Sequence, residues 1–142
     1  MIYLKIIAAL LIVAFIGIQF VPVERSNPPV AGEIDAPAQV KELMRRSCYD
    51  CHSNETVWPW YSYIAPASWL LADDVTEGRA ELNFSEWNGY DEKMKQKKIK
   101  ETWEEVGEGE MPQWYYILMH PEARLSEADK KTLQEWTAAR GK

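Results

Sequence analysis

The chain begins with its most apolar stretch, and regular alternation of apolar and polar positions starts only after it. From Ile6 to Val23 the single polar residue is Gln19, and Lys5 precedes this run. A membrane-spanning helix needs about 20 mostly apolar residues, whereas a cleaved secretory signal needs a small-residue A-x-A-like site after its apolar core. No such site follows. We therefore predict that residues 1–23 form an uncleaved N-terminal transmembrane helix, with a cleaved signal segment as the alternative.

Polar residues and prolines dominate residues 24–35, which we interpret as a linker to a folded domain over residues 36–142. Within that domain apolar residues recur at helical spacing, and no stretch alternates with a period of two. The pattern predicts an all-α domain. Helices are expected at residues 36–47, from about Pro66 to Gly78, at 91–106, at 112–121 and from Ser126 onward.

Local signals give the expected ends of these helices. Asp35 is a candidate N-cap for the first helix, because a short polar side chain can accept a hydrogen bond from the first turn. Ser126 and Asp129 resemble a capping box at the start of the last helix. Gly107 and Gly109 are expected to stop the helix before them.

The charge of the chain limits its partners. The sequence has 16 basic and 22 acidic residues, a formal net charge of −6. Residues 1–23 contain one lysine and no acid, so the remaining residues carry a net charge of −7. A basic nucleic-acid footprint is absent, so no nucleic acid is expected. An acidic surface favours encounter with a basic protein partner.

Both cysteines of the chain lie in one pentapeptide, Cys48-Tyr49-Asp50-Cys51-His52. C-x-x-C-H is the attachment signature of a c-type haem. Two thiols three positions apart at a helix end lie near one face of a turn, where they can reach the two vinyl groups of one haem. The next residue, His52, then supplies an imidazole to the iron, and its second nitrogen is expected to donate to a carbonyl.

Three other interpretations of this pentapeptide remain open. Cys48 and Cys51 could form a structural disulfide in an oxidising compartment. They could form a thioredoxin-like redox pair, although the βαβ pattern of that fold is missing. They could also form part of a zinc site together with His52 and His120, the two histidines of the chain.

Met111 is the expected distal iron ligand. It lies between Gly109 and Pro112, and the following proline disfavours helical geometry, so Met111 should lie on an extended loop. The alternatives are packing of Met111 into the core, His120 as the ligand, or no protein ligand. The choice matters because a thioether ligand raises the potential and favours electron transfer, whereas an open site permits small-ligand binding or peroxidase-like chemistry.

Aromatic residues are numerous after the pentapeptide, and packing around the cofactor is their default role. Trp58 and Trp60, which flank Pro59 close to the pentapeptide, are the candidates for hydrogen bonding a haem propionate through their indole N–H groups.

The string CYDCHSNETVWPWYSYIAPASWLL, followed by GEMPQWYYILMHPEARLSEADKKTLQEW, resembles the haem-binding domain family of bacterial exported proteins, a c-type-cytochrome-like group. The resemblance covers about residues 36–137. It implies a cytochrome-c-like helical domain around one covalent haem, with Cys48 and Cys51 as attachment residues and His52 as the proximal ligand. It implies Met111 as the distal ligand less directly, and it does not supply a partner.

These patterns together predict a membrane-anchored mono-haem c-type cytochrome-like protein that transfers one electron at a time. The predicted location is the cytoplasmic (inner) membrane, with a single pass and the haem domain on the periplasmic side. The predicted partners are the membrane, through residues 1–23, and a redox protein of unknown identity. The alternative function is a haem-based sensor or peroxidase-like enzyme with an open or displaceable sixth iron site; an electron carrier is favoured over an enzyme.

Overall fold

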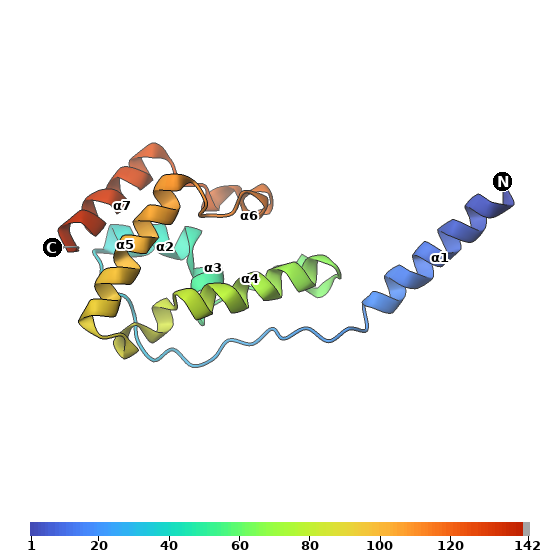
Figure 1. Ribbon diagram of the computed structural model, residues 1–142, viewed down its shortest axis with the longest axis horizontal. Coiled ribbons are helices and arrows are strands. Elements are labelled where there is room, and N and C mark those ends of the chain that lie inside the picture. The colour runs from blue at the N-terminus through green and yellow to red at the C-terminus, as the bar shows by residue number, and fades with distance from the viewer. Residues whose placement is uncertain (141–142) are drawn as a thin grey trace.

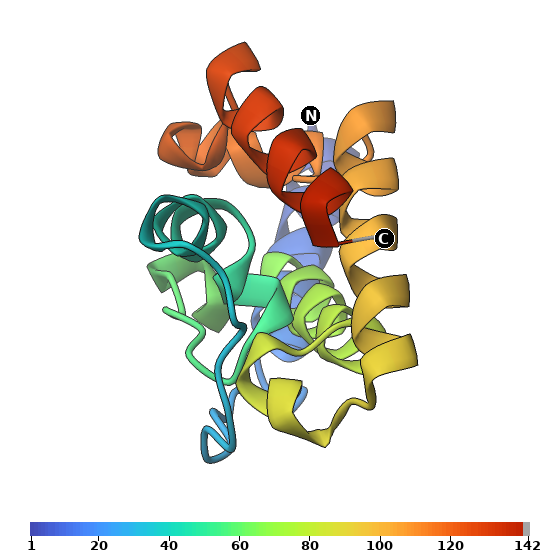
Figure 2. The same ribbon diagram turned by 90° about the vertical axis from the view of Figure 1, so that its left-hand side faces the viewer.

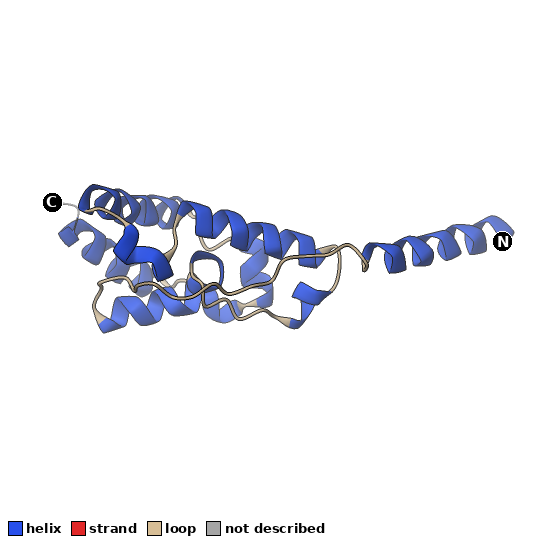
Figure 3. Ribbon diagram, turned by 90° about the horizontal axis from the view of Figure 1, so that it is seen from below, coloured by secondary structure: helices blue, strands red, loops and turns tan. Residues whose placement is uncertain are grey.

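The computed structural model describes residues 1–140 as helices joined by loops, and no strand occurs among these residues (Figures 1 and 3). The prediction of an all-α protein is confirmed for this part of the chain. One long helix projects away from a domain that contains the other helices. The elements are α1 (Ile2–Ile18), α2 (Ala38–Ser47), α3 (Tyr49–His52), η1 (Trp60–Tyr63), α4 (Ala67–Glu81), η2 (Phe84–Gly89), α5 (Glu92–Glu108), α6 (Trp114–Met119), η3 (Pro121–Ala123) and α7 (Glu127–Arg140).

The core of the domain lies where α2, α5 and α7 meet. Figure 2 shows α7 crossing α5, and α2 contacts α7. Helices α3 and α4 pack together beside this core. Burial of apolar side chains along one stripe of each helix stabilises this arrangement. The core residues on the three helices are Val40, Leu43, Met44, Ile99, Val106, Leu133 and Trp136.

Two of the predicted helix ends are confirmed. Helix α5 ends at Gly109, which has a left-handed backbone (φ 84°) that glycine adopts without steric cost. Gly107, also expected to stop this helix, lies inside it. At the start of α7 the Ser126 N–H donates to the Asp129 carboxylate (2.9 Å), and the Asp129 N–H donates to Ser126 Oγ (3.2 Å). This reciprocal pair is the predicted capping box.

The predicted cap of α2 is wrong. The helix starts at Ala38 with Pro37 at the N-cap position, and no side chain caps it. The carboxylate of Asp35 instead accepts a hydrogen bond from Arg140 at the end of α7 (2.9 Å). Asp35 thus ties the start of the domain to its last helix.

The residues between α1 and α2 are irregular, as expected for a linker, but they lie along the domain (Figure 1). The N–H groups of Ala31 and Gly32 both donate to the carbonyl of Ser85 (2.8 Å each), and the Asn27 amide donates to the carbonyl of Thr56 (2.9 Å). Ile34 is 1% exposed. Hydrogen bonds and one buried side chain therefore fix this segment to the domain surface.

Helix α1 has no buried residue. At 1.5 Å per residue, its 17 residues extend about 26 Å, less than the roughly 30 Å of a hydrocarbon core. Among residues 1–140, no helix combines the length and the apolar character required to cross a membrane. The predicted transmembrane helix over residues 1–23 is therefore not supported.

Candidate functional site

The C-x-x-C-H pattern lies where α2 gives way to α3. Helix α2 ends at Ser47, and Cys48 (φ −130°, ψ −32°) departs from helical geometry before α3 begins at Tyr49. The carbonyl of Cys48 then accepts hydrogen bonds from the N–H groups of Cys51 (3.2 Å) and His52 (2.9 Å). One tight turn thus carries both thiols and the imidazole.

A cavity of about 520 Å³ opens beside this turn, and Cys48, Cys51 and His52 all line it. Its walls come from α3, α4 and α5 and from the segment 111–116. Met111, from the segment after α5, also lines the cavity. The structure therefore brings two thiols, an imidazole and a thioether to one cavity, whose volume lies in the range that holds small ligands and cofactors.

The imidazole of His52 is held in one orientation by α4. Its Nδ1 lies 2.8 Å from the carbonyl oxygen of Gly78 and 3.1 Å from that of Leu82. Carbonyl oxygens only accept, so Nδ1 carries the proton and Nε2 keeps a free lone pair for a metal. Burial lowers the pKa of His52, which favours this neutral, ligating form.

Gly78 is required where α4 approaches α3. A Cβ at this position would lie 2.7 Å from the carbonyl oxygen of Cys51 and 3.1 Å from its carbonyl carbon, so only glycine fits without displacing the backbone. The sequence pattern placed a helix end at this residue, whereas α4 continues to Glu81. An isolated glycine within a helical pattern was the available signal, because such a residue often marks a close contact.

The loop between α5 and α6 presents Met111. After the turn at Gly109, the N–H groups of Glu110 and Met111 both donate to the carbonyl of Glu105, at 3.0 and 3.2 Å. Met111 is partly buried against the core and also lines the cavity. The Met111 side chain can therefore pack against the core and still be exposed to the cavity.

Two hydrogen bonds from tyrosines of α6 to carboxylates close the cavity on one side. The Tyr116 hydroxyl donates to Asp50, inside the C-x-x-C-H pattern, at 2.6 Å, and the Tyr115 hydroxyl donates to Asp74 of α4 at 3.1 Å. Burial and the acceptor Asp50 raise the pKa of Tyr116, so this hydroxyl stays protonated. No sequence pattern predicted these pairs, because Asp50 and Tyr116 are far apart along the chain.

The cavity wall is mainly acidic. Among the described residues, Lys98 of α5 is the only lysine or arginine on the wall, and its side chain is 13% exposed. Its ammonium group lies 3.2 Å from Glu101 and 3.8 Å from Glu81. The carboxylates on the two helical walls are Asp74, Glu77, Glu81, Glu101, Glu104 and Glu105.

The two cysteines are free thiols. Burial is the main cause that raises the pKa of each thiol to about 12, so both remain neutral near pH 7. Among residues 1–140, no group of three or more histidine, cysteine or acidic side chains has a geometry that would hold a metal ion. The zinc interpretation therefore has no assembled ligand set in this part of the chain.

His120 lies outside the cavity wall, and both of its ring nitrogens have partners. Nδ1 is 3.1 Å from the Glu122 carboxylate, and Nε2 is 2.7 Å from the Tyr61 hydroxyl. Its ring stacks on that of Tyr116 with centroids 4.3 Å apart. These contacts explain His120 as a residue that joins η1 to α6.

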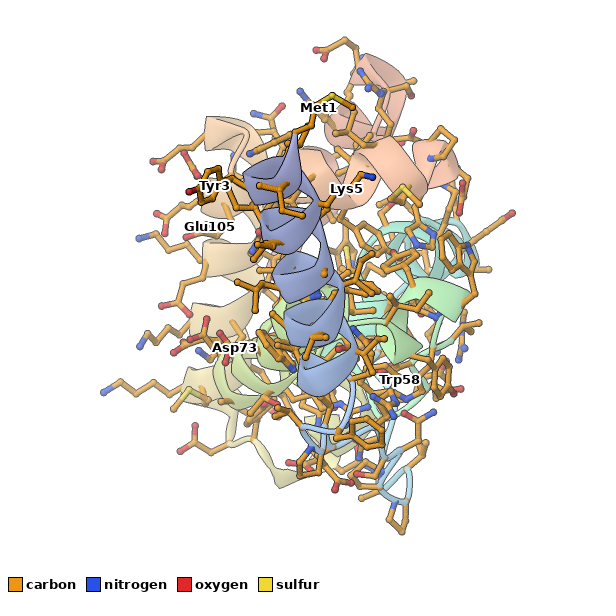
Figure 4. All side chains as sticks on the ribbon, turned by 90° about the vertical axis from the view of Figure 1, so that its right-hand side faces the viewer. Met1, Tyr3, Lys5, Trp58, Asp73 and Glu105 are labelled. Atoms are coloured by element: carbon orange, nitrogen blue, oxygen red, sulfur yellow. The ribbon has the colours of Figure 1, made fainter. Side chains whose placement is uncertain are left out.

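Trp58 and Trp60 also lie away from the cavity wall. Ser53 is extended (φ −147°, ψ 170°), which directs the chain away from the turn that carries His52. Trp60 is 69% exposed. In Figure 4, Trp58 is on the opposite side of α1 from Glu105, a residue of the cavity wall.

Thiols suit haem vinyl groups, while imidazole and thioether suit haem iron, so the donor set of this cavity fits the cofactor. The fold and the site define a haem-binding protein. Comparison with protein families agrees, since residues 13–139 match the family described as "Haem-binding domain", and the chain belongs to that family. No curated protein and no solved structure matches the chain.

Proposed function

We propose that the protein holds one haem covalently, as a c-type cytochrome does, and serves in one-electron transfer. The observation that carries this proposal is the arrangement around His52. Its Nδ1–H is fixed by the carbonyls of Gly78 and Leu82, in a cavity that both cysteines line. A disulfide gives no reason for an imidazole held with its free nitrogen available, and residues 1–140 contain no assembled ligand set for zinc.

Attachment needs no further redox agent. Each thiol, at Cys48 and at Cys51, adds across one vinyl group: a carbon–sulfur bond forms, the vinyl π bond is lost, and the thiol hydrogen ends on the other vinyl carbon. Because both residues lie on one turn, the two bonds would fix the porphyrin edge next to His52. The haem would supply an iron that cycles between the ferrous and ferric states.

Met111 is the residue we propose for the other face of the iron. Its position on the cavity wall, on a loop held by Glu105, supports this role. A thioether ligand favours the ferrous state and blocks the coordination position that a small ligand would use. The proposal therefore favours electron transfer over sensing or peroxidase-like activity.

Lys98 would hold a haem propionate. Vinyl and propionate groups lie on opposite edges of a porphyrin, so a haem attached through Cys48 and Cys51 would carry its propionates away from these residues. Carboxylates on α4 and α5 would repel the propionates, and Lys98 is the one cation on the cavity wall among the described residues. Charge pairing at this partly buried position supports that role for Lys98, and the role suggested by the sequence for Trp58 and Trp60 stays a prediction.

We also propose that maturation and function take place on the periplasmic side, with a basic redox protein as partner. The net charge of −6 supports such a partner through electrostatic steering. Subcellular fractionation of the tagged, haem-stained protein tests the location.

The test of the cofactor is an absorption spectrum before and after acid–acetone extraction, after expression with haem-maturation machinery. We expect the pigment to remain on the wild-type polypeptide. It should be extractable from the Cys48→Ser, Cys51→Ser double variant. A colourless wild-type protein, or a pigment that extracts from it, would overturn covalent attachment.

The test of the sixth ligand is carbon monoxide binding to the reduced protein. Wild type should bind it poorly and Met111→Ala readily, while Met94→Ala, which removes a methionine from α5 outside the cavity wall, should behave as wild type. Ready binding by wild type would favour the sensor or peroxidase-like function.

A further inference from the structure

Large exposed apolar side chains gather at the end of the domain from which α1 projects. They come from η1, the first turn of α4, and α6, which lie on that side of the domain in Figure 1. Trp60 is 69% exposed, Trp114 73% and Leu118 68%. We call this surface the apolar end; it consists of Trp60, Tyr63, Leu70, Trp114, Leu118 and Met119.

The haem site does not account for the apolar end. None of its six side chains lines the cavity. Helix α6 divides its residues between two surfaces, because Tyr115 and Tyr116 line the cavity while Trp114 and Leu118 face outward. A bound cofactor would therefore leave the apolar end exposed. Large apolar side chains that are exposed together at one end of a domain indicate an interaction site.

The exit of α1 is fixed at the same end. Gln19, which follows α1, pairs with the backbone of Ala65 between η1 and α4: its amide nitrogen donates to the Ala65 carbonyl (3.2 Å), and its amide oxygen accepts from the Ala65 N–H (2.9 Å). Arg25 donates to the Ser62 carbonyl (3.0 Å) and stacks on the Tyr63 ring at 4.5 Å. Figure 4, viewed from this side, shows α1 in front of the domain.

From Ile6 to Ile18, after Lys5, helix α1 is apolar around its whole circumference. Leu4, Leu11 and Val13 are each exposed by more than 60%, and none of its residues is buried. Each such side chain favours transfer out of water by about 1.5–3 kcal/mol when fully buried. An apolar environment must therefore lie beside the apolar end, because α1 leaves the domain there.

We propose that the apolar end rests on the surface of a lipid bilayer, with Trp60, Tyr63 and Trp114 at headgroup level. Tryptophan and tyrosine favour that level because their rings are apolar and their N–H and O–H groups are polar. One bilayer can bury α1 and also cover the apolar end, because both lie on the same side of the domain. A folded protein partner would need to enclose α1 on all sides and cover the apolar end as well.

The interaction is apolar in origin. The chain has a net charge of −6, so attraction to anionic headgroups does not drive it. Binding to phosphatidylcholine vesicles should therefore be nearly independent of salt concentration.

The experiment compares two methionines of the full chain in phosphatidylcholine vesicles, using hydroxyl radicals from water radiolysis. Met119 in the apolar end is 52% exposed, and Met94 at the start of α5 is 39% exposed. Exposure alone predicts faster oxidation of Met119. The proposal predicts the reverse, because lipid covers Met119 and leaves Met94 in water. Faster oxidation of Met119 would overturn it.

A second measurement separates lipid from a second copy of the chain. Lipid coverage predicts the same protection of Met119 at all protein-to-lipid ratios, whereas protection that rises with that ratio indicates self-association and overturns the proposal. The triple variant Trp60→Ser, Trp114→Ser, Leu118→Ser should bind vesicles at least about tenfold more weakly than Met94→Ser; equal binding would also overturn it. Both readouts are independent of haem, so failure of the proposed function would leave them unchanged.

Discussion

His52 and Gly78 are joined by a 2.8 Å contact between the imidazole Nδ1 and the backbone carbonyl, across the interface of α3 and α4. This contact exists because Gly78 has no side chain. Its absent Cβ would meet the carbonyl of Cys51. One glycine thus determines both how closely two helices pack and which nitrogen of the histidine is free.

Replacing Gly78 by alanine should loosen this interface. We expect a loss of about 1–3 kcal/mol in the free energy of unfolding, because the added methyl group displaces backbone atoms. Chemical denaturation of the purified protein measures it. The matched control is Gly107→Ala inside α5, where a Cβ would meet only the Trp103 ring at 3.5 Å; alanine there should be neutral or stabilising by up to about 1 kcal/mol. Equal effects of the two substitutions would contradict the close contact.

Tyr116→Phe should weaken the attachment of α6 to the C-x-x-C-H turn. The substitution removes the hydroxyl that donates to Asp50 at 2.6 Å and leaves a partly buried acceptor with one fewer donor, at a cost of about 1–3 kcal/mol in unfolding free energy. Tyr63→Phe serves as control, since its exposed ring keeps its stacking on Arg25. Thermal unfolding compares the stability of both variants with that of wild type. A Tyr116→Phe variant as stable as wild type would show that the Tyr116–Asp50 pair contributes nothing to stability.

Asp129 should contribute stability that depends on pH. Hydrogen bonds from Ser126 are the main cause that lowers the pKa of this carboxyl in the folded state. A lowered folded-state pKa means that the contribution is complete above the unfolded-state pKa and disappears as the pH falls through the folded-state value. Asp129→Ala should cost about 1 kcal/mol near pH 7.

Denaturation of wild type and Asp129→Ala between pH 7 and acid measures this dependence. The difference in unfolding free energy between wild type and Asp129→Ala should narrow once the pH falls below the unfolded-state pKa of about 4. Glu127→Ala, at a neighbouring side chain that is 92% exposed, is the control. A difference that stays constant with pH would contradict the role of the ionised carboxylate.

Lys98→Gln should lower the midpoint potential of the haem-loaded protein. The substitution removes the cation on the cavity wall. Loss of this positive charge favours the more positive ferric state over the ferrous state, which lowers the midpoint potential. Lys97→Gln, one residue earlier on α5 with a side chain 61% exposed, should leave the potential nearly unchanged. Potentiometric titration compares them, and equal potentials for the two variants would exclude Lys98 as a close neighbour of the cofactor.

Local rules accounted for much of this structure. Helical periodicity predicted α5 and α7, and the Ser126–Asp129 pair formed because a capping box involves residues only three apart. The spacing of Cys48, Cys51 and His52 depends on a single turn, so the sequence predicted their common direction. These features need no information about distant parts of the chain.

Several features that the sequence did not predict involve contacts between distant residues. Asp35 pairs with Arg140 across the domain, which competes with its expected capping role. Trp58 is close to His52 along the chain but does not line the cavity; its buried indole N–H has no partner among the described residues, and its proposed role toward a propionate stays a prediction. His120 is paired with Tyr61 and Glu122. Proximity along the sequence does not predict proximity in space once the chain leaves a helix.

The contacts along residues 19–35 have a consequence for how the haem site would meet other molecules. A domain on a free tether explores a large volume and can turn its cofactor toward whichever protein arrives. Here residues 19–35 form hydrogen bonds with the domain at Ala65, Ser62, Thr56 and Ser85. The cavity therefore has a fixed position and orientation relative to α1. A partner protein must approach from the direction in which the cavity opens.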